Sequence, residues 1–103
     1  MIKFTTVLNT DGSIRRFTVD GHSGFAESGE DIVCAAVSST VWMTINGIEK
    51  QNLAKLSYEE CDGFVKCILS DKSEGADILL DSLVMFITEL SGQYKEFLKF
   101  TQM

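Results

Sequence analysis

The order in which strand-like and helix-like segments follow one another is the feature that most limits the folds open to this chain. Short runs of β-branched and aromatic residues occupy residues 2–8 and 14–19, and the Asn-Thr-Asp-Gly at residues 9–12 has the composition of a turn. These segments predict a β-hairpin. Residues 21–30 follow as a loop, because they hold three glycines and show no apolar period.

The segment from Asp31 onward predicts a helix, because its small and branched residues follow the i, i+3, i+4, i+7 spacing without a gap. Ser28 and Asp31 resemble a capping box with Asp31 in the place of the usual Glu, or Asp31 is itself the N-cap. Gly47 lies near its expected end. The apolar stripe, which should pack on a sheet, consists of Val33, Ala36, Val37, Thr40, Val41, Thr44, Ile45 and Ile48.

The second half of the chain repeats this order. Residues 53–58 and 64–69 alternate in polarity around a turn at Cys61-Asp62-Gly63, so a second hairpin is expected. A second helix is expected from Glu74, and its apolar positions are Leu79, Leu83, Phe86, Ile87, Leu90, Tyr94, Phe97 and Leu98.

The predicted order is therefore ββαββα, in a single domain that spans residues 1–103. The predicted fold class is α+β, with the two helices packed on one face of a largely antiparallel sheet. A chain of this size buries one core, so an active site has to be built from residues of that same fold. The large residues Phe97, Leu98 and Phe100 suggest an apolar face that a small domain leaves uncovered, and hence an interface.

The charge balance argues against nucleic acid as a partner. Nine basic and fifteen acidic residues give a formal net charge of −6, and an acidic surface repels phosphate backbones while it attracts a basic partner. The start of the chain shows no signal peptide, and no uninterrupted apolar stretch approaches the length that spans a bilayer. We expect a cytoplasmic, reducing setting and no membrane partner.

The three cysteines do not have the spacing of a disulfide framework or of a metal site, so no metal or other cofactor is expected. Cys61 at a turn and Cys67 on the inward face of a strand are interpreted as structural. Cys34 differs from them, because it lies beside the apolar stripe and shares a polar helix face with Asp31 and Ser38.

Cys34 also falls in the first turns of the predicted helix. Amide groups there have no helical partner and the helix dipole is positive at that end, and both effects favour the thiolate, which is the form that attacks a carbonyl. The free amides could also receive the oxyanion of acyl transfer. His22, the only histidine, opens the loop that leads back to this helix and could act as the base. Taken alone, a cysteine and a histidine in one chain are a weak signal.

The residues Gly21-His22-Ser23, together with Asp-Ile-Val-Cys-Ala-Ala-Val-Ser at residues 31–38, resemble the signature of the ribosomal-processing cysteine protease family, Prp. The distance between the two halves matches, and the element order and length match over essentially the whole chain. The family often has alanine where this chain has Ser23, and we expect a change between two small residues to be tolerated.

The resemblance implies both an activity and a partner. Family members remove an N-terminal extension with a Phe-rich end from a large-subunit ribosomal protein (number twenty-seven), and they form homodimers. Cys34 matches the family's nucleophile and His22 matches its histidine. The loop over residues 23–30 matches a mobile segment that covers the site. The implied partner is the basic N-terminal segment of that ribosomal protein, and the loop or substrate-contacting residues are Gly21, Ser23, Gly24, Phe25 and Gly29.

Several alternatives remain open from the residues themselves. The chain could bind a ribosomal protein tail without cutting it, act as a redox sensor through reversible oxidation of Cys34, or serve as a structural dimer module. Asp31 could orient His22 or only cap the helix, and Ser38 could belong to the site or be a plain surface serine. Trp42 could contact a Phe-rich substrate or belong to the core.

Overall fold

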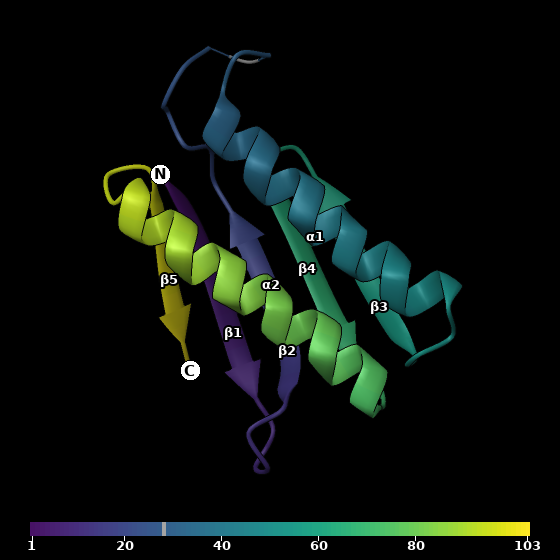
Figure 1. Cartoon of the computed structure of the whole chain (residues 1–103). Coiled ribbons are helices and arrows are strands. Elements are labelled where there is room, and N and C mark those ends of the chain that lie inside the picture. The colour runs from purple at the N-terminus through teal and green to yellow at the C-terminus, as the bar shows by residue number, and fades with distance from the viewer. Residues whose placement is uncertain (28) are drawn as a thin grey trace.

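The computed structural model describes residues 1–27 and 29–103. Two β-hairpins are each followed by a helix, and a last short strand ends the chain (Figure 1). The elements are β1 (Ile2–Leu8), β2 (Ile14–Asp20), α1 (Ile32–Lys50), β3 (Leu56–Cys61), β4 (Phe64–Leu69), α2 (Glu74–Gln93) and β5 (Leu98–Gln102).

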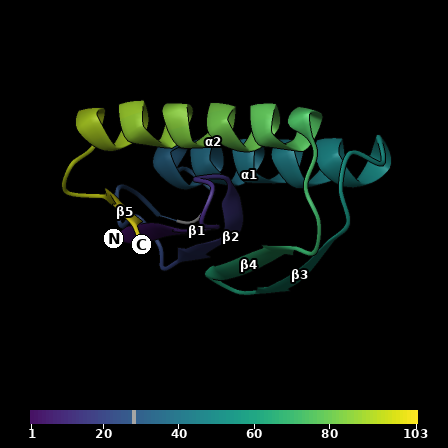
Figure 2. The same cartoon turned by 90° about the horizontal axis from the view of Figure 1, so that it is seen from below.

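The strands form one five-stranded sheet in the order β3-β4-β2-β1-β5. All neighbouring pairs are antiparallel except β1 and β5, which run parallel. Both helices lie on the same face of this sheet, as the edge-on view shows (Figure 2). The predicted α+β class, with two helices on one face of a largely antiparallel sheet, is confirmed.

The core lies between the sheet and the two helices. Alternate residues of β1 point into it, and Phe4 of that strand stacks on Phe17 of β2 with ring centroids 5.6 Å apart. The predicted stripe of α1 supplies the opposing side, and six of its members are buried: Val33, Val37, Val41, Thr44, Ile45 and Ile48. By length and composition α1 would also be long enough to cross a membrane, a test that core helices of soluble proteins pass as well. Its packing on the sheet is that of a core helix.

The start of α1 agrees with the prediction of an Asp31 cap. The Asp31 carboxylate accepts hydrogen bonds from the amides of Val33 and Cys34, which have no carbonyl partner inside the helix. The alternative that includes Ser28 lies outside the described residues. The helix continues past Gly47 and ends at Lys50.

The predicted start of the third strand at residue 53 is wrong, because β3 begins at Leu56. Residues 51–54 instead close the end of α1: the Leu53 amide donates to the Ile48 carbonyl at 2.9 Å, and Asn52 has a positive φ of 54°. The side chain of Leu53 packs toward Gly75 at the start of α2. Its apolar character therefore reflects helix packing, and the strand alternation applies only from Leu56.

The predicted second helix is too long, because it ends at Gln93 and the chain then forms β5. The amides of Phe97 and Leu98 both donate to the Tyr94 carbonyl in the turn between them. Leu98 continued the helical period by coincidence, although Leu98 and Phe100 also alternate with polar residues as a strand does. β5 pairs with β1 and covers its outer edge.

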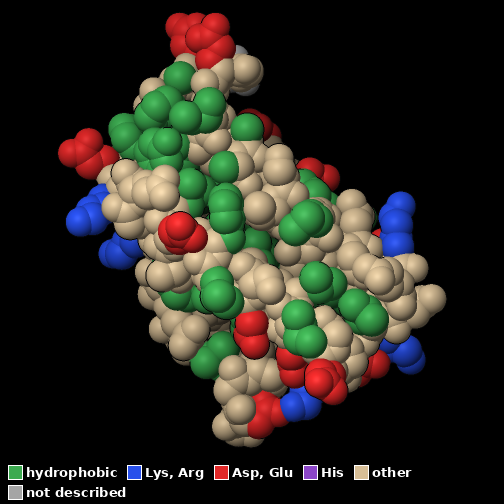
Figure 3. Space-filling model, in the orientation of Figure 1, with side chains coloured by type: hydrophobic (Ala, Val, Ile, Leu, Met, Phe, Trp, Pro, Cys, Tyr) green, Lys and Arg blue, Asp and Glu red, His purple; other side chains and the backbone are tan. Residues whose placement is uncertain are grey.

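The prediction of an uncovered apolar face near the C-terminus is also wrong for its central residue, Leu98, which is only 1% exposed. Phe97 and Phe100 are partly buried against the core. The exposed large apolar side chains of the helices are elsewhere, at Ile78 and Met85 of α2 and at Ile32 and Met43 of α1. Figure 3 shows apolar side chains scattered along the helical face and gathered near the end where the loop after β2 meets α2.

Candidate active site

An open pocket of about 540 Å³ lies where the first turns of α1 face the ends of β2 and of the β3–β4 hairpin. Cys34 and His22 both line it, so the fold brings the two predicted chemical groups to one cavity. Ser38 lines it as well, one turn along α1 from Cys34. The rest of the wall is formed by Ile2, Val19, Gly21, Val37, Val41, Trp42, Glu60, Cys61, Asp62, Gly63, Phe64 and Val65.

Cys34 is the third residue of α1 and is half-buried. Its amide donates to Asp31 Oδ1 at 2.9 Å, which fixes its backbone at the helix start. The backbone N–H of Ser23 donates to Cys34 Sγ at 3.4 Å. The sulfur therefore accepts a backbone N–H from the neighbouring loop and also lies at the positive end of the dipole of its own helix.

His22 lies on the pocket wall at the end of β2, and its side chain is 65% exposed. Its Nε2 is 3.8 Å from Asp62 Oδ1 in the β3–β4 turn, close enough for attraction when the imidazole is protonated. Within residues 1–27 and 29–103, Asp62 supplies the carboxylate that lies within 4 Å of the His22 imidazole. The expectation that Asp31 orients His22 finds no support in this arrangement.

Gly21 explains why the histidine is preceded by glycine. Its φ is +97°, and a Cβ there would overlap the Met1 carbonyl oxygen. The Gly21 amide donates to the Gly63 carbonyl at 2.8 Å, which ties the end of β2 to the neighbouring hairpin turn. This close approach places His22 over Gly63.

Asp31 uses both of its carboxylate oxygens. Oδ1 accepts from the amides of Val33 and Cys34, and Oδ2 accepts from the Ser23 hydroxyl. Partial burial on its own would raise the pKa of Asp31, but the hydrogen bond from Ser23 and the bonds from Cys34 and Val33 outweigh it and hold the pKa below its usual value. Asp31 is thus a charged cap that also anchors the loop.

These bonds alter one expectation from the sequence. Free amides at the start of the helix were expected to be able to receive an oxyanion, but those of Val33 and Cys34 already donate to Asp31. Helix N-terminal amides are available to a substrate only when no side chain caps them. The backbone amide that contacts the Cys34 sulfur is instead that of Ser23.

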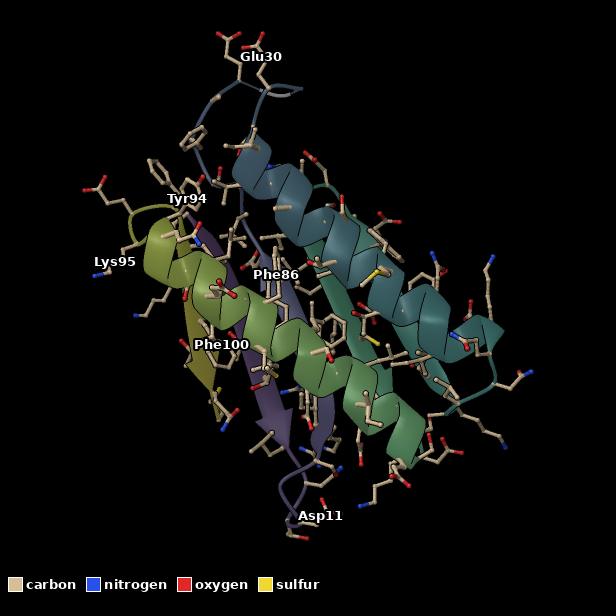
Figure 4. The ribbon with its side chains drawn as sticks, in the orientation of Figure 1. Asp11, Glu30, Phe86, Tyr94, Lys95 and Phe100 are labelled. Atoms are coloured by element: carbon tan, nitrogen blue, oxygen red, sulfur yellow. The ribbon has the colours of Figure 1, made fainter. Side chains whose placement is uncertain are left out.

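The loop after Ser23 turns away from the pocket in this structure. Phe25 packs edge-to-face against Tyr94 and Phe97, with ring centroids 5.6 and 5.3 Å apart. Figure 4 shows Tyr94 beside the loop and Glu30 at its outer tip. Gly24 and Gly29 have positive φ and face open space. Of the predicted loop contacts, Gly21 lines the pocket, whereas Ser23, Gly24, Phe25 and Gly29 do not.

The remaining cysteines have different settings. Cys67 is fully buried in β4, and burial, assisted by the negative charge of Glu49, raises its pKa to about 12. This agrees with a structural role. Cys61 is exposed and lines the pocket, so its reading as a structural turn residue is incomplete. Trp42 lines the pocket, packs edge-to-face on Tyr58 with ring centroids 5.3 Å apart, and is partly buried against the core.

Sequence reasoning missed the contribution of the second hairpin. Glu60, Asp62 and Gly63 line the pocket, but they lie far along the chain from His22 and Cys34. The available signal was the Asp-Gly pair of a tight turn, which predicts a hairpin and says nothing of its neighbours. Among the residues that the structure describes, no group of three or more His, Cys, Asp and Glu side chains is placed to hold a metal ion.

A half-buried thiol at a helix start, with an imidazole on the wall of the same open pocket, is compatible with a thiol-dependent hydrolase. The family model for cysteine protease Prp matches residues 1–99. The chain belongs to the cysteine protease Prp family, and it is a cysteine protease.

Individual relatives cover nearly the whole chain. The ribosomal processing cysteine protease Prp of Mycoplasma pneumoniae is 32% identical over 108 residues, covering 97% of this chain and 93% of its own. The protein of the same name from Bacillus subtilis is 26% identical, covering 98% and 96%. The crystal structure of the essential ribosomal processing protease Prp from S. aureus, with a covalently linked product peptide, shares the fold with a TM-score of 0.95 at 23% identity and full coverage of both chains.

Proposed function

We propose that this protease removes the N-terminal extension of a large-subunit ribosomal protein (number twenty-seven), cleaving after a Phe-rich segment. The observation that carries the proposal is the placement of Cys34 and His22 on one pocket wall, with Cys34 in the first turn of α1. Support for the substrate comes from the relatives, which bear the name ribosomal processing protease. The S. aureus relative has been crystallised with substrate and product peptides.

The proposed mechanism passes through an acyl-enzyme. His22 takes the proton of the Cys34 thiol, and the sulfur attacks the scissile carbonyl carbon to form a tetrahedral intermediate. The Ser23 amide, already directed at the sulfur, donates to the oxyanion. The C–N bond then breaks as His22 protonates the leaving amine, and water hydrolyses the thioester to release the carboxylate and restore the thiol.

The pocket wall has features that suit such a peptide. Glu60 and Asp62 place negative charge on the hairpin side of the pocket, which would attract a basic segment. Ile2, Val41 and Trp42 give it an apolar side on which phenylalanine could pack. Cleavage of a ribosomal protein requires a cytoplasmic location, and the free thiols Cys34, Cys61 and Cys67 suit a reducing compartment.

A homodimer is part of the proposal. Ile78 and Met85 of α2 and Met43 of α1 are exposed apolar residues on the helical face that a second copy could cover. Gel filtration with light scattering measures the mass directly, and a monomer at micromolar concentration would rule the dimer out.

The test of the proposed function is cleavage of a peptide that spans the extension, followed by mass spectrometry. Wild-type protein is expected to yield two fragments, while Cys34→Ala and His22→Ala leave the peptide intact. Cys61→Ala is the matched control, because it removes another thiol from the pocket wall and should retain cleavage. Full cleavage by Cys34→Ala would overturn the assignment. Binding without cleavage by the wild-type protein would favour a non-enzymatic binding module.

A redox-sensing role is the second candidate, because Cys61 lies on the same pocket wall as Cys34. Peroxide would oxidise the Cys34 thiol to a sulfenic acid with release of water, and the Cys61 thiol would displace a second water to form a disulfide. Peroxide treatment would then lower the intact mass by two hydrogens in the wild type but not in Cys61→Ala. An unchanged mass, or sulfinic acid at Cys34 without a disulfide, would reject this role.

A further inference from the structure

Ser23 is a buried polar residue that joins the loop to two residues at the N-terminal end of α1, Asp31 and Cys34. Its relative exposure is 3%, and both its hydroxyl and its backbone amide form hydrogen bonds. The hydroxyl donates to Asp31 Oδ2 and accepts from the Phe25 amide at 3.1 Å. The backbone N–H donates to Cys34 Sγ at 3.4 Å. One residue therefore contacts the helix cap and the thiol, and it directly follows His22.

The hydrogen bond from the Ser23 hydroxyl stabilises the negative charge of the Asp31 carboxylate at Oδ2. Oδ1 is satisfied by two amides of α1, whereas Oδ2 receives its hydrogen bond from Ser23. The carboxylate also accepts the backbone N–H of Cys34 at 2.9 Å, so Asp31 and Cys34 are near neighbours at the start of α1. A negative charge next to a thiol opposes loss of its proton, and a hydrogen bond to the carboxylate weakens that opposition.

We propose that Ser23 is a positioning residue for the protease reaction: its hydroxyl holds the Asp31 carboxylate on the helix cap and keeps the Ser23 amide on the Cys34 sulfur. The proposal rests on the proposed catalytic role of Cys34 and gives a further role to a residue between the two reacting groups. Ser23 does not itself exchange a proton with the substrate. Its hydroxyl acts through Asp31 and through the conformation of the segment from His22 to Phe25, which aims the Ser23 amide.

Loss of the hydroxyl has two consequences that follow from these contacts. Asp31 Oδ2 loses its side-chain donor, so more of its charge acts on the neighbouring thiol. The Phe25 amide loses its acceptor, so the segment that aims the Ser23 amide at the sulfur is held less firmly. Both changes make the Cys34 thiolate less favourable, and neither removes a large side chain from the core.

The experiment measures the rate at which iodoacetamide alkylates Cys34 between pH 5 and 10, read by mass spectrometry of the peptide that contains it. This readout needs no peptide cleavage, so its result is independent of the proposed substrate. The contacts of the hydroxyl revise the expectation that alanine is tolerated at this position: in Ser23→Ala we expect the rate at pH 7 to fall about fivefold, with the rise of the profile displaced to higher pH. The other titratable groups on the pocket wall, His22, Glu60, Cys61 and Asp62, are the same in every variant.

Two further variants separate positioning from a general loss of structure. Asp31→Asn keeps a side chain that caps a helix but removes the charge, so Ser23→Ala should have a smaller effect on alkylation in that background, with only the contribution of the Phe25 contact left. Ser39→Ala, an exposed serine of the same helix, should match the wild type. Thermal unfolding checks that each variant is folded. A folded Ser23→Ala with a wild-type profile, or an equal effect of Ser23→Ala with and without the Asp31 charge, would overturn the proposal.

Discussion

His22 lies so close to Gly63 that a Cβ on the glycine would come within 2.8 Å of Nε2. Gly63 also has a φ of +71°, so the β3–β4 turn both permits and supports the position of the imidazole. The Gly63 carbonyl accepts from the Gly21 amide on the other side of the histidine. A hairpin distant in sequence thus sets where the proposed base can lie.

Gly63→Ala should displace the His22 ring and lower kcat/KM by ten- to about 100-fold, because small misplacements of a catalytic group have effects of that size. Gly12→Ala is the matched control: its φ of +89° imposes similar backbone strain, but a Cβ there meets open space. It should lose stability and keep kcat/KM per folded molecule. Equal losses of activity in the two variants would mean that strain alone is responsible.

Gly21→Ala should destabilise the fold, because the added Cβ would overlap the Met1 carbonyl at a backbone conformation that alanine rarely adopts. We expect a loss of about 2–3 kcal/mol in the free energy of unfolding, measured by urea denaturation. Gly92→Ala, inside α2 with open space around it, should instead gain about 0.5–1 kcal/mol. A Gly21→Ala protein of wild-type stability would show that the N-terminal residue can move aside.

Asp31 should stabilise the fold in a pH-dependent way. Its pKa is lower in the folded than in the unfolded chain, so the unfolded chain binds more protons between the two values and stability rises with pH there. The contribution is complete above about pH 4 and disappears as the pH falls through the folded-state pKa. Asp31→Ala should cost about 1 kcal/mol at pH 7, and the difference from wild type should shrink below pH 3. A difference that stays constant down to pH 2 would contradict this.

Cys67 should limit stability at alkaline pH. Its pKa is raised from 9.0 to about 12 in the folded protein, so above pH 9 the unfolded chain has lost a proton that the folded chain keeps. Stability then falls as the pH rises, by about 1.4 kcal/mol per unit from this group. Cys67→Val, which cannot ionise, should show a shallower decline between pH 9 and 11 in urea denaturation. Parallel declines would mean that the buried thiol does not ionise on unfolding in this range.

Most of the architecture could be predicted because it depends on short-range patterns. The apolar spacing of α1 identified the side that packs on the sheet, and the Asp-Gly turns identified both hairpins. The fifth strand could not be found in this way, because Leu98 fits the helical period of α2 as well as a strand alternation with Phe100. The choice between helix and strand depends on pairing with the free edge of β1, which is a tertiary contact.

The candidate site likewise combines features that short-range sequence patterns predict with contacts that depend on the tertiary fold. The sequence indicated Cys34 and His22, the Asp31 cap and the loop between them, all within one stretch of chain. It did not indicate that Asp31 would bond to Ser23 in preference to His22, or that Asp62 and Gly63 would lie against the imidazole. Those contacts depend on the order of strands in the sheet, which places the β3–β4 turn beside the end of β2.

The position of the first residue has a practical consequence for fusion proteins. The Met1 carbonyl lies against Gly21, Ile2 forms part of the pocket wall, and the Ile2 amide donates to the Phe97 carbonyl at 2.8 Å. A purification tag joined to the N-terminus would therefore emerge beside the pocket mouth, where a flexible peptide could compete with the substrate as a tethered inhibitor. A tag at the other terminus would extend from the end of β5 at the sheet edge, so the placement of an affinity handle can itself change the measured rate.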